Sequence, residues 1–170
     1  IWELDVLRGV CILGMVLVHL IYDLQTFFSL PFLTNSELFS LIKQWGGVLF
    51  LLISGICVTL GSHPVRRGLI VFACGLLCSA VTAGMYVLNM ADKSIIIYFG
   101  VLHCLGVCML LWPLLKGLPV WVLGLVGLGL TVLGLWLSGN VFVDFSWLIP
   151  LGLYPRGFAS SDYFPLLPNL

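Results

Sequence analysis

The chain has 170 residues, of which 61% are hydrophobic and only 8% are charged. Soluble domains carry about a quarter charged residues, so this composition cannot cover a water-facing surface and excludes a soluble domain. Seven basic and seven acidic residues give a formal net charge of zero, which excludes a nucleic-acid-binding protein with a basic surface.

Five apolar runs follow one another along the chain, and a bilayer crossing takes about 20 such residues. The predicted spans are residues 6–28, 46–61, 68–90, 95–115 and 120–137. Residues 29–45 are predicted to form a mixed loop between the first two spans. Residues 142–153 are a further apolar run, too short to cross, and are predicted to be re-entrant or interfacial. The predicted fold class is all-α, a polytopic helical membrane protein with about five transmembrane helices and this short segment.

A length of 170 residues allows one domain, and residues 1–170 are predicted to form a single transmembrane domain. The chain begins at Ile1 rather than at a methionine, and it ends within the apolar run 165–170. We therefore expect it to be the amino-terminal part of a longer domain.

Lys and Arg residues near the span ends indicate the orientation, because they favour the cytoplasmic side. With a cytoplasmic amino terminus, the inner side holds Arg8, Arg66, Arg67 and Lys116. The outer side then holds Lys43, Lys93 and Arg156. The Arg66–Arg67 pair falls in a very short turn, where this rule is strongest. The amino terminus and residues 62–67 are therefore predicted to be cytoplasmic, and residues 29–45 external.

Six cysteines lie inside the apolar runs, where a thiol packs as a small hydrophobe. They are Cys11, Cys57, Cys74, Cys78, Cys104 and Cys108. Two pairs, 74 with 78 and 104 with 108, have the i,i+4 spacing that could hold a metal or let helices pack closely. Close packing is the commoner use of small residues at this spacing, so free thiols and no metal site are predicted.

Titratable side chains within apolar spans cost roughly 2.5 to 3.5 kcal/mol on insertion scales, so they mark candidate sites. In the first span Arg8, His19 and Asp23 fall along one helical stripe, with about 16 Å between Arg8 and His19 along the axis. Asp23 can accept a hydrogen bond from one ring nitrogen of His19 and leave the other nitrogen basic. A structural interpretation is also open, in which His19 bonds a neighbouring helix and Arg8 snorkels to the interface.

A further histidine, His103, lies in the fourth predicted span, and the predicted orientation places it and His19 in the outer half of the membrane. Unpaired imidazole and carboxylate groups are penalised in hydrocarbon. We therefore predict that His19, Asp23 and His103 converge on one polar cavity that opens to the outer side. A hydrogen bond from His103 to a neighbouring helix is the structural alternative.

The first span begins with Leu-Asp-x-x-Arg-Gly at residues 4–9, and this start together with residues 15–19 resembles the opening of membrane-bound acyltransferases. It is similar to both the heparan-alpha-glucosaminide N-acetyltransferase catalytic-domain family and the acyltransferase type 3 family. In the type 3 family a histidine near the end of the first helix is the proposed catalytic base, and His19 matches it. Shorter and less specific likenesses cover residues 49–55, 99–103 and 162–168.

Two positions depart from the eukaryotic N-acetyltransferases. Those enzymes carry a histidine shortly before the second helix, where residues 40–45 contain none, and an asparagine where His19 stands.

The resemblance implies an acyltransferase that takes an acyl group from cytoplasmic acetyl-CoA, or another acyl-CoA, without a metal. It implies a sugar or envelope glycan as the acceptor and a bacterial cytoplasmic membrane as the location. Membrane lipids are expected partners, nucleic acid is not, and an oligomer is compatible with the sequence. His19 would be the catalytic base and Asp23 its orienting partner. The residues implied in binding are Arg8 and Asp5 for the donor, and His103, Arg156 and Asp162 for the acceptor.

Two other functions fit the buried polar residues less well. A proton-coupled transporter would use His19, Asp23 and His103 as a relay, but inverted repeats with broken helices, which are typical of transporters, are not visible in the sequence. A structural membrane protein would leave the same residues without a role.

Overall fold

The computed structural model describes residues 2–28 and 37–169, and every regular element in this part of the chain is a helix. This arrangement satisfies the backbone hydrogen bonds within each segment, as hydrocarbon requires. The all-α prediction is therefore confirmed. The chain divides into two compact units, Ile1–Leu60 and Gly61–Leu170, which are described separately.

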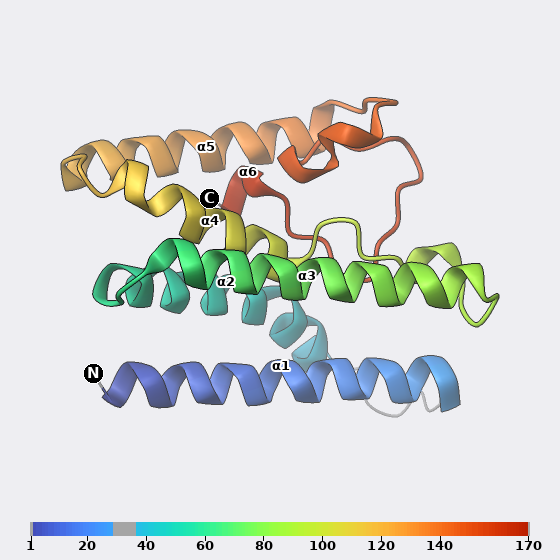
Figure 1. Cartoon of the computed structure of the whole chain (residues 1–170). Helices are drawn as coiled ribbons and strands as arrows, with labels where there is room; N and C mark the ends of the chain where they lie inside the picture. Colours follow the sequence, from blue (N-terminus) through green and yellow to red (C-terminus); the bar gives the residue numbers. More distant parts are fainter. Residues whose placement is uncertain (1, 29–36, 170) are drawn as a thin grey trace. The chain divides into compact units, whose positions relative to one another are not determined.

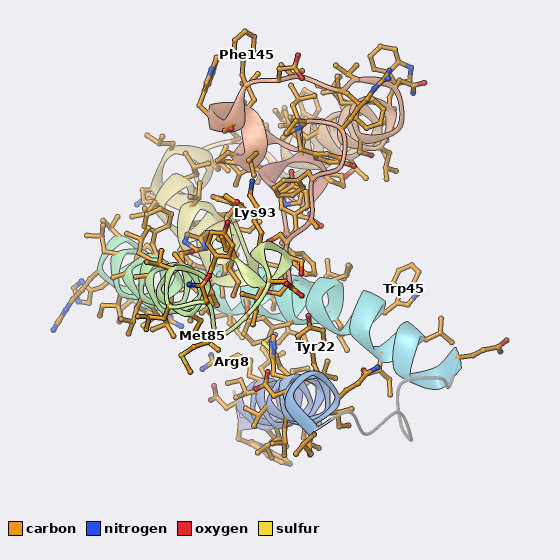
Figure 2. The ribbon with its side chains drawn as sticks, turned by 90° about the vertical axis from the view of Figure 1, so that its right-hand side faces the viewer. Arg8, Tyr22, Trp45, Met85, Lys93 and Phe145 are labelled. Carbon is orange, nitrogen blue, oxygen red and sulfur yellow. The ribbon has the colours of Figure 1, made fainter. Side chains whose placement is uncertain are left out.

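The first unit contains α1 (Trp2–Phe28) and α2 (Glu37–Leu60), which pack against each other (Figure 1). Among the described side chains of α2, Ile53, Ser54, Cys57 and Val58 are buried; they lie one turn apart in pairs and form a single face. Many other apolar side chains in the unit are exposed, as expected for helices that meet lipid. Trp45 is one of them, and Figure 2 shows its ring standing away from the ribbon.

The second unit begins with α3 (Pro64–Val87), the short 3-10 helix η1 (Lys93–Ile95) and α4 (Val101–Leu115). It continues with α5 (Val120–Asn140), the 3-10 helix η2 (Ser146–Leu151) and the short α6 (Leu166–Asn169). Within this unit α3 packs along α4, and α6 packs against α5 (Figure 1).

Three of the described helices, α1, α3 and α5, contain stretches that are long and apolar enough to cross a membrane. The apolar parts of the other two predicted spans are shorter, at Trp45–Leu60 and Val101–Leu115. The structure thus supports an integral membrane protein with three long candidate spans and two shorter apolar helices.

Three predicted boundaries are wrong. Helix α3 begins at Pro64 and not at residue 68, because proline suits the first turn of a helix, so Arg66 and Arg67 lie in α3 and not in the predicted turn. Residues 37–45 belong to α2 and not to a loop; their polar side chains are compatible with a helix, and Glu37 favours a helix start through the helix dipole. The remaining loop residues, 29–36, lie outside the described part of the chain. In the fourth span α4 begins at Val101 and not at residue 95, because the carbonyl groups of residues 95–97 accept hydrogen bonds from side chains outside the helix.

Glycines bring α3 and α4 unusually close together. A Cβ atom added to Gly106 would lie 2.8 Å from the Cβ of Phe72 and 2.9 Å from its backbone nitrogen. On α3, a Cβ at Gly68 would lie 3.0 Å from the carbonyl oxygen of Gly106. Small residues at such crossings let membrane helices pack through their backbones.

We predict that Gly106→Ala lowers the stability of the protein by about 1 to 3 kcal/mol, because the added methyl group meets the backbone of α3. Gly84→Ala is the matched control, since a Cβ there meets nothing within 4 Å. Thermal unfolding midpoints in one detergent would compare the variants. Equal midpoints for both variants would contradict the close crossing.

Candidate functional site

Two of the residues predicted to be functional, His103 in α4 and Asp162 in the segment before α6, meet at the start of α4. The first N–H groups of a helix have no partner within it, so they need acceptors from elsewhere. Here the Val101 N–H donates to Oδ2 of Asp162 over 3.0 Å, and the Gly100 N–H donates to Nδ1 of His103 over 3.3 Å. His103 and Asp162 therefore meet at two consecutive peptide groups, although 59 residues (162 minus 103) separate them.

The His103 ring is only 3% exposed and is held on several sides. The rings of Phe72 and Phe99 each lie 5.4 Å from it, centroid to centroid, and Phe72 makes an edge contact. A Cβ at Gly75 would lie 3.0 Å from Nδ1, so a larger residue at this position would crowd the ring against α3. Because Nδ1 accepts a hydrogen bond, the neutral ring carries its proton on Nε2. Nε2–H is thus a donor of fixed direction.

Asp162 is positioned by backbone pairing between two distant segments. Residues Phe99 and Tyr163 form a parallel bridge, and the Phe164 N–H donates to the Phe99 carbonyl over 2.9 Å. The Ser160 hydroxyl donates to the Ile96 carbonyl over 2.8 Å. These contacts fix the carboxylate beside the start of α4.

Helix α3 also holds the segment before α4, through Ile97. The Ser79 hydroxyl donates to the Ile97 carbonyl over 2.6 Å, and the Ile97 N–H donates to the Thr82 hydroxyl over 3.2 Å. The sequence indicates such a role only weakly, since Ser, Thr and Asp commonly bond nearby backbone groups. Their partners here are 15 or more residues away, so local patterns could not identify them.

The other candidate residues on α1 form a separate group. The Arg8 guanidinium lies 3.4 Å from the Asp5 carboxylate, a partly exposed pair spaced i,i+3, and Figure 2 shows Arg8 on this helix. His19 and Asp23 are both exposed, and within residues 2–28 and 37–169 no hydrogen bond joins them. Their convergence with His103 on one cavity stays a prediction.

Arg156 lies in the loop after η2 and is exposed. Its guanidinium carbon lies 5.6 Å from the centroid of the Phe142 ring, at cation–π distance. No group of three or more metal-ligating side chains occurs among the described residues. All six cysteines are free thiols.

Comparison with known proteins identifies a family. A family model described as Heparan-alpha-glucosaminide N-acetyltransferase, catalytic, matches residues 1–170. The resemblance of the first span to that family is therefore confirmed over the whole chain. No curated protein and no solved structure matches the chain.

We predict that Asp162→Ala destabilises the protein by about 1 kcal/mol, because the Val101 N–H loses its acceptor. Asp162→Asn should cost less, since the amide oxygen can still accept this bond. Thermal unfolding midpoints would separate the two variants. The capping role would be wrong if Asn and Ala lowered the midpoint equally.

Proposed function

We propose, because the chain belongs to the heparan-alpha-glucosaminide N-acetyltransferase catalytic family, that it is a membrane-embedded acetyltransferase acting on a sugar or envelope glycan. The family implies acetyltransferase activity with acetyl-CoA as the donor. The match over residues 1–170 is the observation that carries the proposal. Apolar helices long enough to span a membrane are consistent with it.

In the proposed reaction an acceptor hydroxyl or amine attacks the carbonyl carbon of the acetyl thioester. The new C–O or C–N bond forms, the C–S bond breaks, and the acceptor proton passes to a base while the thiolate leaves. His19 is the proposed base, because its exposed ring makes no hydrogen bond within the described chain and can meet a substrate. Asp23, one helical turn away, is the proposed orienting group.

Arg8 and Asp5 are the proposed donor-binding residues. Coenzyme A carries phosphates, and a guanidinium group binds phosphate oxygens in a fixed fork geometry. The Arg8 side chain is about one third exposed and is paired with Asp5 at 3.4 Å. The partner carboxylate would hold the guanidinium in place before the donor arrives.

His103, Asp162 and Arg156 are the proposed acceptor-binding residues. His103 would donate a hydrogen bond to the acceptor from its Nε2–H, because Nδ1 already accepts a bond from the Gly100 N–H. Asp162 would act mainly by holding the start of α4 in place. It would thereby fix the direction of the His103 ring. Arg156 is exposed and could pair with acidic groups of a glycan.

We predict that His19→Ala lowers the rate of acetyl transfer by at least about 100-fold, because a general base contributes two to four orders of magnitude. The exposed ring leaves no core cavity when it is removed, so the unfolding midpoint should not change. His63→Asn is the control, because His63 is exposed in a turn at φ 56°, a conformation that asparagine tolerates. Transfer at the wild-type rate by the His19 variant would contradict this mechanism.

We also propose that the protein lies in a bacterial cytoplasmic membrane with its amino terminus inside, so that the donor site faces cytoplasmic acetyl-CoA. Ser62 and Asp92 are exposed in the two turns that flank α3. Because Arg66 and Arg67 favour the inner side, a cysteine placed at Ser62 should react with an impermeant thiol reagent only after lysis. A cysteine at Asp92 should react in intact cells. The reverse labelling pattern would overturn this orientation.

A further inference from the structure

The segment that follows α5, residues 142–151, has one face packed into the protein. Ile149 is 5% exposed, and its carbonyl accepts a hydrogen bond from the Tyr163 hydroxyl over 2.8 Å. Burial, with Tyr154 nearby, raises the pKa of Tyr163 above its usual value, so the phenol stays protonated and can donate. The Val143 N–H donates to the Tyr154 carbonyl over 3.3 Å. The segment is therefore fixed against the rest of its unit.

Residues 142–151 also expose several large apolar side chains. Trp147 is 74% exposed and Phe145 is 59% exposed, and their ring centroids are 6.4 Å apart. Figure 2 shows the Phe145 side chain standing away from the ribbon of its own segment. Leu151 is also exposed, and Phe142 is exposed on the side that Tyr154 and Arg156 do not contact. Large aromatic groups gathered on one face mark a surface that contacts something other than water.

The position of this face follows from α5. Helix α5 has 21 residues, Val120–Asn140, which at 1.5 Å per residue gives about 31 Å, close to the hydrocarbon thickness of a bilayer. Its exposed side chains are apolar along most of its length, as lipid contact requires. The chain therefore leaves α5 at the level of the lipid headgroups, and Phe142 follows only two residues after the helix ends.

Polar groups on the segment exclude a position deep in the hydrocarbon. Asp144 is exposed, and a carboxylate in hydrocarbon is costly. The backbone N–H groups of Phe142, Asp144 and Phe145 also find no acceptor within the described chain. Such groups need water or headgroup oxygens, which the hydrocarbon interior does not provide. Aromatic side chains, by contrast, are enriched at the interface.

We infer that residues 142–151 form an interfacial anchor that lies in the boundary between headgroups and acyl chains, with Phe145 and Trp147 inserted into the lipid. The occupant of this face is the bilayer itself, because the face continues the lipid-contacting surface of α5. Asp144 and the backbone N–H groups face the hydrated headgroups. This anchor does not depend on the proposed acetyl transfer.

Fluorescence quenching by brominated phosphatidylcholine tests the anchor on the full-length protein in vesicles. The emission of Trp147 is obtained as the difference between wild type and Trp147→Phe. Bromines near the carbonyl end of the acyl chain should quench this difference signal more than bromines near the methyl end. The matched control is Leu128→Trp in the Trp147→Phe protein, because Leu128 is exposed near the middle of α5. Its signal should show the opposite preference.

Two outcomes would overturn the inference. Stronger quenching of Trp147 by bromines near the methyl end would place the segment within the hydrocarbon as a re-entrant loop. No quenching at either depth, with the Leu128→Trp control quenched, would show that protein or water covers the face. Both results are independent of any enzymatic assay.

Discussion

The start of α4 needs hydrogen-bond acceptors that its own backbone cannot supply, and much of the unit Gly61–Leu170 is organised around this need. In water such N–H groups would be solvated, but in apolar surroundings an unpaired backbone group is expensive. The Gly100 and Val101 N–H groups are satisfied by His103 and Asp162. Gly100 itself has no space for a side chain, because a Cβ there would collide with the Asp162 carboxylate.

This requirement connects segments that are far apart in the sequence. Asp162 reaches Val101 because residues 160–164 pair with residues 96–99. Helix α3 also bonds to residues 96–99, through the Ser79 hydroxyl and the Ile97 carbonyl. The close crossing of α3 and α4 then brings Gly75 against the His103 ring. One side chain thus serves helix capping through Nδ1 and keeps a fixed donor at Nε2. A rigid polar group in apolar surroundings is what a binding or catalytic site requires.

The sequence predicted those features that depend on local pattern. The apolar runs at α1, α3 and α5 are long and continuous, and the structure finds helices there. His103 could be selected as a candidate because a titratable residue in an apolar span needs a partner or a function, and Asp162 was selected through the family resemblance of residues 162–168. Their meeting at Gly100 and Val101 could not be predicted, since hydropathy carries no information about a partner 59 residues away (162 minus 103). The starts of α2 and α4 were predicted wrongly, because hydropathy does not detect polar residues that belong to a helix. It also does not detect side-chain hydrogen bonds to the backbone of residues 95–97. His19, Asp23, Arg8, Asp5 and Arg156 keep their proposed roles as predictions.

We propose that this protein transfers acetyl groups at a membrane, and the most direct measurement follows the acetyl group itself. The full-length protein would be reconstituted in vesicles with acetyl-CoA labelled in its acetyl group, and with glucosamine and extracted envelope glycans as acceptors. We expect the label to appear in an amide or ester of the acceptor while free coenzyme A thiol accumulates in equal amount. Unlabelled acceptors and unconsumed acetyl-CoA, with a proton flux across the same vesicles, would contradict it and favour a transporter.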